Sequence, residues 1–393
     1  MNLFGEDPRI LLFSLLFKLS NGKLPRIPYV NTASRDRFSL YLPSTRSAAY
    51  KRYLNQRIRK MLKLPSGPDA VTIAVTHRCP LRCPHCSAAL FNKSEELSTK
   101  DIKRLITQCV DLGCYNITFT GGEPLIREDI VDLVKYAAEQ NVVVQIFTSA
   151  VNLSINLLEN LLKAGLSSLH ISLDSPCPHE HDSLRGVEGL FDKAILAIKA
   201  ARRKGIPVGI STYATHQAIK TGKLMELIRL AEKLRVNEVS IFELIPTGRL
   251  LHASHSIILT DDEKDHLRSL YVKHSHDPKR VKIWSWSYIE YGVRYAGLKY
   301  LLNPEALGCL AVRYMIHITA DGYVTPCDFM PLSFGNVMDE PLTEIYRKMK
   351  NHPIFRRINN SCLMQNPDFR EKYLSNISKE SRLPCPIDNV RPS

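Results

Sequence analysis

The chain has 393 residues, a formal net charge of +14 and an apolar fraction of 44%. This length exceeds that of one ordinary hydrophobic core but suits a large α/β barrel with appended segments, or two domains. Its ten cysteines are too sparse for a disulfide-stapled secreted scaffold, and they are grouped as metal ligands are. The composition therefore predicts a protein of a reducing compartment, the cytoplasm.

The N-terminal region, residues 1–69, is predicted to be a basic, partly helical extension. The first 70 residues contain 13 Lys and Arg against 4 Asp and Glu. The apolar run at residues 9–19 is shorter than the roughly 20 residues that span a bilayer, and it lacks the features of a signal peptide. With the basic segment at 51–63 it fits a helix lying on the anionic inner face of a membrane. The alternative is a helix that packs across the main domain beside a solvated basic face.

Short β-rich runs alternate with amphipathic segments after residue 70. Strands joined by helices favour parallel βα units, because parallel strands need long crossover connections. We therefore predict a partial or complete α/β barrel, or an open doubly wound sheet. The first predicted helix follows Ser98, a candidate N-cap in a capping-box pattern. The predicted strands are 70–76, 116–120, 142–148, 167–173, 206–213 and 236–245, and the predicted helices are near 99–112, 127–140, 154–164, 189–204 and 222–234.

Unusual residues follow five of the six predicted strands. The loops are HRCPLRCPHC at 77–86, GGEP at 121–124, TSA at 148–150, SLDS at 172–175 and PTGR at 246–249. The carboxyl ends of parallel strands are where ligands and chemistry collect in α/β barrels and open sheets. The five loops therefore predict one site.

Three cysteines, Cys79, Cys83 and Cys86, follow the first strand with CxxxCxxC spacing. This spacing, with GGEP after the second strand, resembles the radical S-adenosylmethionine (SAM) superfamily over roughly residues 70–250. The resemblance implies a partial (β/α)6 parallel barrel in which the three cysteines hold a 4Fe-4S cluster, since thiolates are the usual ligands of such clusters. It also implies an enzyme that reductively cleaves SAM at this cluster, so that a 5′-deoxyadenosyl radical abstracts a hydrogen atom from the substrate. The alternative is a zinc site completed by His77 or His85.

The same resemblance assigns the neighbouring loops to SAM. The GGEP segment would meet the methionyl ammonium, because glycines let the backbone approach a ligand closely. An arginine suits the methionyl carboxylate through its planar fork of donors. The implied residues are Gly121, Gly122, Glu123 and Pro124 for the ammonium, Ser172 and Arg185 for the carboxylate, Thr148 and Ser149 for the ribose, and Ile245 for the adenine.

The C-terminal region, 281–393, is predicted to be a small cysteine-containing domain that follows a core domain at 70–280. Residues 309–327 contain two alternating strands around an ADG turn, and a loop at 334 leads into an amphipathic helix that reaches 349. This unit resembles the SPASM or twitch extension of radical SAM enzymes, which holds auxiliary iron-sulfur clusters. Its four cysteines permit one auxiliary 4Fe-4S cluster. The implied ligands are Cys309 and Cys327 in the hairpin, with Cys362 and Cys385 as weaker members of the set.

The sequence leaves the substrate open between a peptide side chain and a membrane lipid or isoprenoid. SPASM-type enzymes as a group most often modify peptides, but residues 1–69 lack the strand pattern of a precursor-binding module. The resemblance implies a reductant such as flavodoxin or ferredoxin. We expect no nucleic-acid partner, because no RNA-binding module is recognisable. The non-enzymatic alternative is an electron-transfer or cluster-carrier protein, which would need no SAM pocket.

Overall fold

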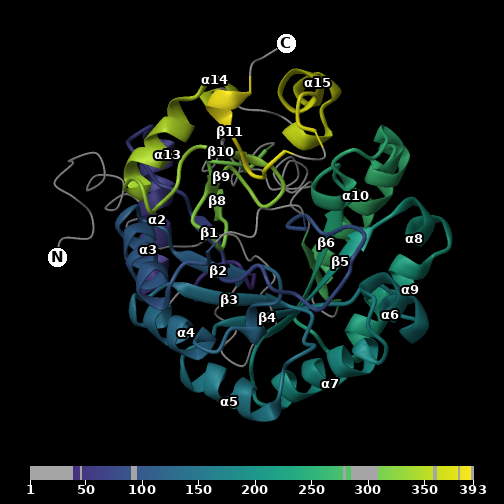
Figure 1. Ribbon diagram of the computed structural model, residues 1–393. Helices are drawn as coiled ribbons and strands as arrows, with labels where there is room; N and C mark the ends of the chain where they lie inside the picture. Colours follow the sequence, from purple (N-terminus) through teal and green to yellow (C-terminus); the bar gives the residue numbers. More distant parts are fainter. Residues whose placement is uncertain are drawn as a thin grey trace.

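Figure 1 shows the protein as a computed structural model, coloured along the chain. The structure describes residues 39–44, 47–89, 95–277, 280–284, 309–356, 361–378 and 381–390. The predicted apolar segment at 9–19 lies outside the described residues. Within the described ranges, no helix is both long enough and apolar enough to cross a membrane.

A curved, mainly parallel sheet forms the centre of the molecule, and helices surround it on the outside (Figure 1). The strand order is β7-β6-β5-β4-β3-β2-β1-β8-β9, and every pairing is parallel except that of β8 with β9. The six predicted strands are confirmed as neighbours β1 to β6, in the arrangement of a partial α/β barrel. The strands are β1 (Ala70–Ala74), β2 (Asn116–Thr120), β3 (Val143–Thr148), β4 (Ser168–Ser172), β5 (Val208–Ala214), β6 (Glu238–Glu243), β7 (Lys282–Trp284), β8 (Met315–Ile318) and β9 (Val324–Thr325).

The five predicted helices are confirmed as the connections between the barrel strands. They are α3 (Thr99–Asp111), α4 (Ile130–Glu139), α5 (Ile155–Lys163), α7 (Leu190–Arg203) and α9 (Lys223–Lys233). Ser98 caps α3 as predicted, because its side chain accepts a hydrogen bond from the backbone N–H of Asp101. The other described α-helices are α2 (Ala48–Met61), α6 (Pro178–Arg185), α8 (His216–Lys220), α10 (Asp261–His276), α13 (Leu342–Asn351), α14 (Pro353–Arg356) and α15 (Pro367–Leu374).

The barrel strands are buried on both faces, which explains why they read as continuous apolar runs. Ile73, Phe119, Ile146 and Ile171 are fully buried, and one contiguous apolar core joins the sheet to its covering helices. This core holds the strand ends in place. The loops at the carboxyl ends of the strands are therefore positioned by a rigid scaffold.

A short stretch at residues 39–42, here called the floor segment, enters the barrel at the amino ends of the strands. Leu40 is fully buried. Its N–H donates to Glu238 Oε2 at 3.0 Å, and its carbonyl accepts from Gln145 Nε2 at 2.9 Å. The ring of Tyr41 stacks on that of Trp284 at 5.6 Å and reaches the cavity described below. The floor segment therefore closes the barrel interior from below.

Helix α2 packs against the barrel, and the structure pairs part of its basic charge internally. Arg57 and Lys60 both form ion pairs with the buried Asp69, which immediately precedes β1. Lys60 also donates to the carbonyl of Arg313 at 2.7 Å, and Arg52 donates to that of Asn141 at 2.9 Å. Helix α2 therefore does more than present a basic face to solvent, because the buried Asp69 pairs with two of its cations, Arg57 and Lys60.

The C-terminal hairpin extends the barrel sheet instead of standing apart from it. The predicted hairpin is confirmed as β8 and β9, with a turn closed by the Gly322 N–H on the Thr319 carbonyl at 2.9 Å. Strand β8 pairs with β1, which lies some 245 residues earlier in the chain. Farther on, β10 (Leu332–Ser333) pairs with β11 (Cys385–Pro386), and α13 packs beside α3. The proposed boundaries at 69 and 280 stay predictions, and β7 begins two residues beyond the second.

Candidate active site

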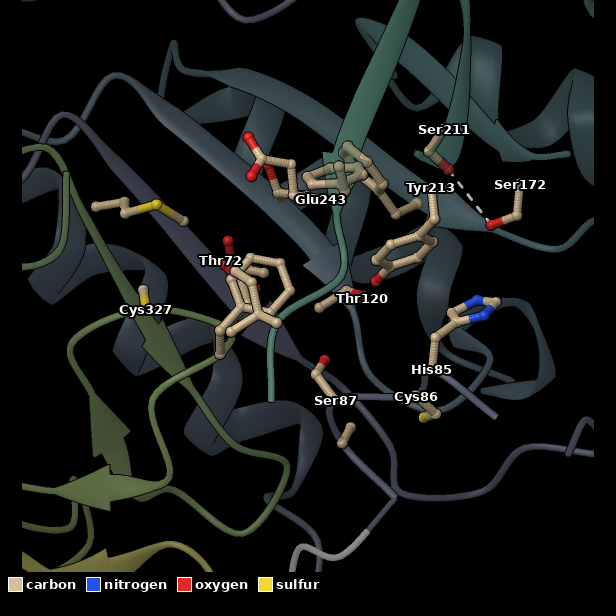
Figure 2. A pocket seen from close by; sticks show the side chains of 18 of the residues that line it. Thr72, His85, Cys86, Ser87, Thr120, Ser172, Ser211, Tyr213, Glu243 and Cys327 are labelled. Carbon is tan, nitrogen blue, oxygen red and sulfur yellow. Dashed lines mark hydrogen bonds between the residues drawn. The ribbon is translucent and has the colours of Figure 1, made fainter. Parts of the chain in front are cut away.

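A cavity of about 390 Å³ opens at the carboxyl ends of the barrel strands. Figure 2 shows Cys86 and His85 on one side of it and Cys327 on the opposite side. Nearly all of the residues predicted from sequence line it, whereas Pro124 and Cys385 do not. The predicted residues that line the cavity are Cys79, Cys83, Cys86, Gly121, Gly122, Glu123, Thr148, Ser149, Ser172, Arg185, Ile245, Cys309, Cys327 and Cys362.

The GGEP loop packs directly on the backbone of the cysteine loop. The Gly122 N–H donates to the carbonyl of Thr76 at 2.7 Å, and the Glu123 N–H donates to that of Arg78 at 2.8 Å. A Cβ atom added to Gly121, whose φ is +138°, would lie 2.4 Å from the Thr76 oxygen, and one added to Gly122 would lie 2.1 Å from the Arg78 oxygen. Both glycines are therefore needed for contact between the two loops, and not only for the approach of a ligand.

The loop after β6 supports the cysteine loop from the other side. Arg249 Nη1 donates to the carbonyl of Cys83 at 2.5 Å, and the Arg249 N–H donates to that of Cys86 at 3.2 Å. A Cβ added to Gly248 would lie 2.1 Å from the Cys86 oxygen. Sequence reasoning singled out PTGR as an unusual loop beside adenine but missed this contact. Arg249 fixes the backbone that carries two of the three thiols.

Glu123 is held by the residues that end β3. Thr148 Oγ1 donates to Glu123 Oε1 at 2.5 Å, and the Ser149 N–H and hydroxyl donate to Oε2 at 2.8 and 2.5 Å. The carboxylate is buried, with 1% of the residue exposed. The Leu125 N–H also donates to Oε1, at 3.2 Å, so four donors occupy the roughly four lone-pair sites of the carboxylate. Thr148 and Ser149 line the cavity and also orient this carboxylate.

A buried charge network lies behind Cys83. Arg185 Nε donates to Asp174 Oδ2 at 2.6 Å, and Arg185 Nη1 points at Cys83 Sγ at 3.6 Å. Burial opposes ionisation of Asp174, but the Arg185 guanidinium outweighs it and keeps the pKa of this carboxyl below its usual range. Burial raises the pKa of the Cys83 thiol, and Arg185 opposes that rise. Arg185 thus places a permanent positive charge next to a cysteine of the predicted cluster.

A second group of thiols lines the far side of the cavity. Cys309, Cys327 and Cys362 come from the segment before β8, the end of the hairpin and the start of η6 (Leu363–Gln365). Burial raises the pKa of Cys327 well above its usual range, and the neighbouring Cys309 and Cys362 raise it further. All three cysteines line the same cavity. Cys385 lies apart, in β11 beside a separate small hollow that contains Arg382.

Two sequence families match these two parts of the site. The model of the radical SAM superfamily matches residues 73–231, and that of SPASM, an iron-sulfur cluster-binding domain, matches residues 309–375. The chain belongs to the radical SAM superfamily and carries a C-terminal SPASM domain. The SPASM match includes Cys309, Cys327 and Cys362 and ends before Cys385.

Curated and solved relatives agree with this assignment. The chain is 29% identical to the AdoMet-dependent heme synthase of Nitratidesulfovibrio vulgaris over 72% of its own length and 79% of that protein. It is 27% identical to the PqqA peptide cyclase of Gluconobacter oxydans, over 75% and 81% of the two chains. Streptococcus suis SuiB, solved bound to its precursor peptide SuiA, has the same fold, with a TM-score of 0.60 and 20% identity over 89% of this chain and 80% of SuiB. These relatives are radical SAM enzymes, and so is this chain.

The residues of this radical SAM site fit the cofactors of the superfamily, which are a 4Fe-4S cluster and SAM, with auxiliary iron-sulfur binding in the SPASM domain. Three thiols on one short loop beside an open cavity form a suitable donor set. His77 Nε2 lies 3.6 Å from Asp321, and His85 Nε2 lies 3.7 Å from Asp174. Burial lowers the pKa of His85 to about 4. The family match, and not these contacts, argues against a zinc site completed by either histidine. In the described part of the chain, no three His, Cys, Asp or Glu side chains are placed to hold a single metal ion.

Proposed function

We propose that this radical SAM enzyme removes a hydrogen atom from a carbon of an organic substrate bound between the two thiol groups. When bound, the catalytic cluster and SAM supply the 5′-deoxyadenosyl radical that such chemistry requires. The single observation that supports the proposal is one continuous cavity, which Cys79, Cys83 and Cys86, the SAM-binding residues, and Cys309, Cys327 and Cys362 all line. An electron carrier would have no use for the SAM-binding part.

The residues of the cavity suggest separate duties. Glu123, already oriented by the end of β3, would attract the methionyl ammonium through its negative charge. Ser172 and Arg185 would meet the carboxylate, and Ile245 would contact the adenine. The ion pair with Asp174 holds Arg185 in one position. A preset guanidinium costs little to order when the ligand binds.

A peptide side chain is our first candidate for the substrate. PqqA peptide cyclases are among the relatives, and the solved structures of similar fold include one with a bound precursor peptide. The second candidate is a tetrapyrrole, as the heme synthase relative suggests. Aromatic rings favour it, because Tyr41, Phe147, Phe242 and Phe329 line the cavity and suit a flat apolar body. The lipid hypothesis depends on residues 9–19, which lie outside the described residues, and on the basic segment at 51–63, most of which belongs to α2 packed on the barrel.

Anaerobic reconstitution followed by product analysis tests the proposal. With dithionite and SAM, the wild-type protein should form 5′-deoxyadenosine and methionine, and the Cys79→Ala/Cys83→Ala/Cys86→Ala variant should form neither. Cys177→Ala is the matched control, because Cys177 is exposed and does not line the cavity. SAM cleavage that persists in the triple variant would refute the proposal. A wild type that holds its iron but does not bind SAM would favour the electron-carrier alternative.

A further inference from the structure

Glu243 is a buried carboxylate on the wall of the cavity that none of the duties above uses. It is the last residue of β6, and 3% of it is exposed. Gln365, three residues after Cys362, donates from Nε2 to Glu243 Oε2 at 2.9 Å. Figure 2 shows Glu243 among the side chains that line the cavity. The residue thus joins the barrel wall to the SPASM segment at the cavity.

The second oxygen of Glu243 has no hydrogen-bond partner among the residues that the structure describes. Oε1 is buried and unpaired. The other two carboxylates of the cavity differ, since Glu123 uses both oxygens and Asp328 accepts from the Thr72 side chain. Leaving a buried carboxylate oxygen without a donor is costly. Oε1 is not open to the cavity, so a ligand donor would reach it, and remove that cost, after a small shift of the Glu243 side chain.

The position of Glu243 tells which end of the substrate it would hold. Gln365, whose Nε2 donates to Glu243 Oε2, ends the short 3-10 helix η6 that begins directly after Cys362. This contact places Glu243 where the barrel wall meets the segment that carries Cys362. Two cations of α10, Lys264 and Arg268, line another part of the cavity. Both are partly exposed, and Arg268 pairs with Asp265. Phe242 and Phe329 also line the cavity, with ring centroids 6.3 Å apart.

We propose that Glu243 anchors the substrate by accepting a hydrogen bond on Oε1 from a nitrogen-borne donor, such as an ammonium, a guanidinium or a ring N–H. This inference rests on the proposed function, because it concerns the substrate of the same cavity. The substrate would have an apolar or ring-shaped body against the aromatic wall and a nitrogen donor at the auxiliary end. A neutral hydrocarbon or isoprenoid chain has no such donor and would leave Oε1 unsatisfied.

Three ring compounds that differ in one terminal group test the proposal on the reconstituted holoenzyme with SAM present. The probes are 2-phenylethylamine, 2-phenylethanol and 3-phenylpropionate, and the readout is the dissociation constant from calorimetry. In the wild type, the amine should bind roughly tenfold or more tightly than the alcohol, because a hydrogen bond to a charged group is stronger than a neutral one. Glu243→Gln should abolish this preference. Glu226→Gln, on the exposed face of α9, should keep it.

The inference would be overturned if the wild type bound the amine and the alcohol equally tightly, or bound the carboxylate most tightly. It would also be overturned if the preference for the amine remained in Glu243→Gln. If the Glu243→Gln variant does not retain iron, the order of the three dissociation constants in the wild type still tests the inference. Failure of the proposed function gives a different result, namely no 5′-deoxyadenosine from the wild type. A wild type that cleaves SAM but ignores the terminal group would refute this inference alone.

Discussion

Single residues around the cysteine loop have duties that the sequence showed only in part. The cysteine spacing predicted which thiols come together, since one short loop fixes their neighbourhood. The contacts of Arg249 with the carbonyls of Cys83 and Cys86 could not be predicted, because a contact across some 165 residues leaves no local pattern. The glycines of GGEP were recognised, but their packing on Thr76 and Arg78 depends on how two loops meet in space.

Replacing Arg249 by Met should weaken the catalytic cluster selectively. The variant loses a hydrogen bond from a charged donor, which is worth about 1.5–3 kcal/mol, so SAM cleavage should fall roughly tenfold or more. Iron should decrease toward the amount held by the SPASM domain alone. Arg229→Met, an exposed site on α9, is the control for loss of an arginine. Full iron content and full cleavage in Arg249→Met would show that the contact has no positioning role.

The C-terminal cysteines should differ in their effect on auxiliary iron. In a protein that already lacks Cys79, Cys83 and Cys86, Cys327→Ala should remove the remaining iron, because Cys327 lies among the clustered thiols. Cys385→Ala should leave it, because Cys385 lies outside the cavity. Iron determination and absorption spectra distinguish the two. Loss of iron in the Cys385 variant would restore that residue to the ligand set predicted from sequence.

At the scale of elements, the local patterns predicted what neighbouring residues determine. β-rich runs that alternate with amphipathic segments indicated β1 to β6 and the helices between them. The ADG turn indicated the C-terminal hairpin. Two features depended on distant partners instead. Strand β8 joins the sheet beside β1, and the floor segment at 39–42 fills the barrel through Glu238 and Gln145. The polar helix α6 was also missed, because its sequence lacks an apolar period.

The floor segment should make stability depend on pH through Glu238. Burial raises the pKa of this carboxyl to about 7, compared with about 4.3 in an unfolded chain. The folded state therefore holds the proton more tightly, so its contribution is complete below pH 4.3 and is lost as pH rises through 7. The total is roughly 4 kcal/mol. Thermal unfolding of the wild type at pH 5.5 and 8 should show this decline.

Glu238→Gln should flatten that decline, because an amide keeps an acceptor for the Leu40 N–H but does not titrate. Glu188→Gln, on the surface, should decline with pH as the wild type does. A pH dependence unchanged in Glu238→Gln would mean that this carboxyl does not couple the floor segment to folding.

At the scale of the whole molecule, the barrel and the SPASM segment build one site. The β1–β8 pairing brings the second group of thiols to the cavity that the barrel strands open, and Gln365 on Glu243 ties the two parts together. The family and its chemistry could be predicted from the cysteine and glycine motifs. The substrate could not, because the aromatic residues that line the cavity come from several elements and have no sequence motif of their own.

Electron paramagnetic resonance of the reduced protein, recorded with and without SAM, tests the central claim most directly. A cluster held by only three cysteines has an open position for SAM, so its signal should change when SAM is added. We predict a SAM-dependent signal in the wild type and in the Cys309→Ala/Cys327→Ala/Cys362→Ala variant, and none in the Cys79→Ala/Cys83→Ala/Cys86→Ala variant. The account would be contradicted by a SAM-dependent signal that is lost in the Cys309→Ala/Cys327→Ala/Cys362→Ala variant and kept in the Cys79→Ala/Cys83→Ala/Cys86→Ala variant.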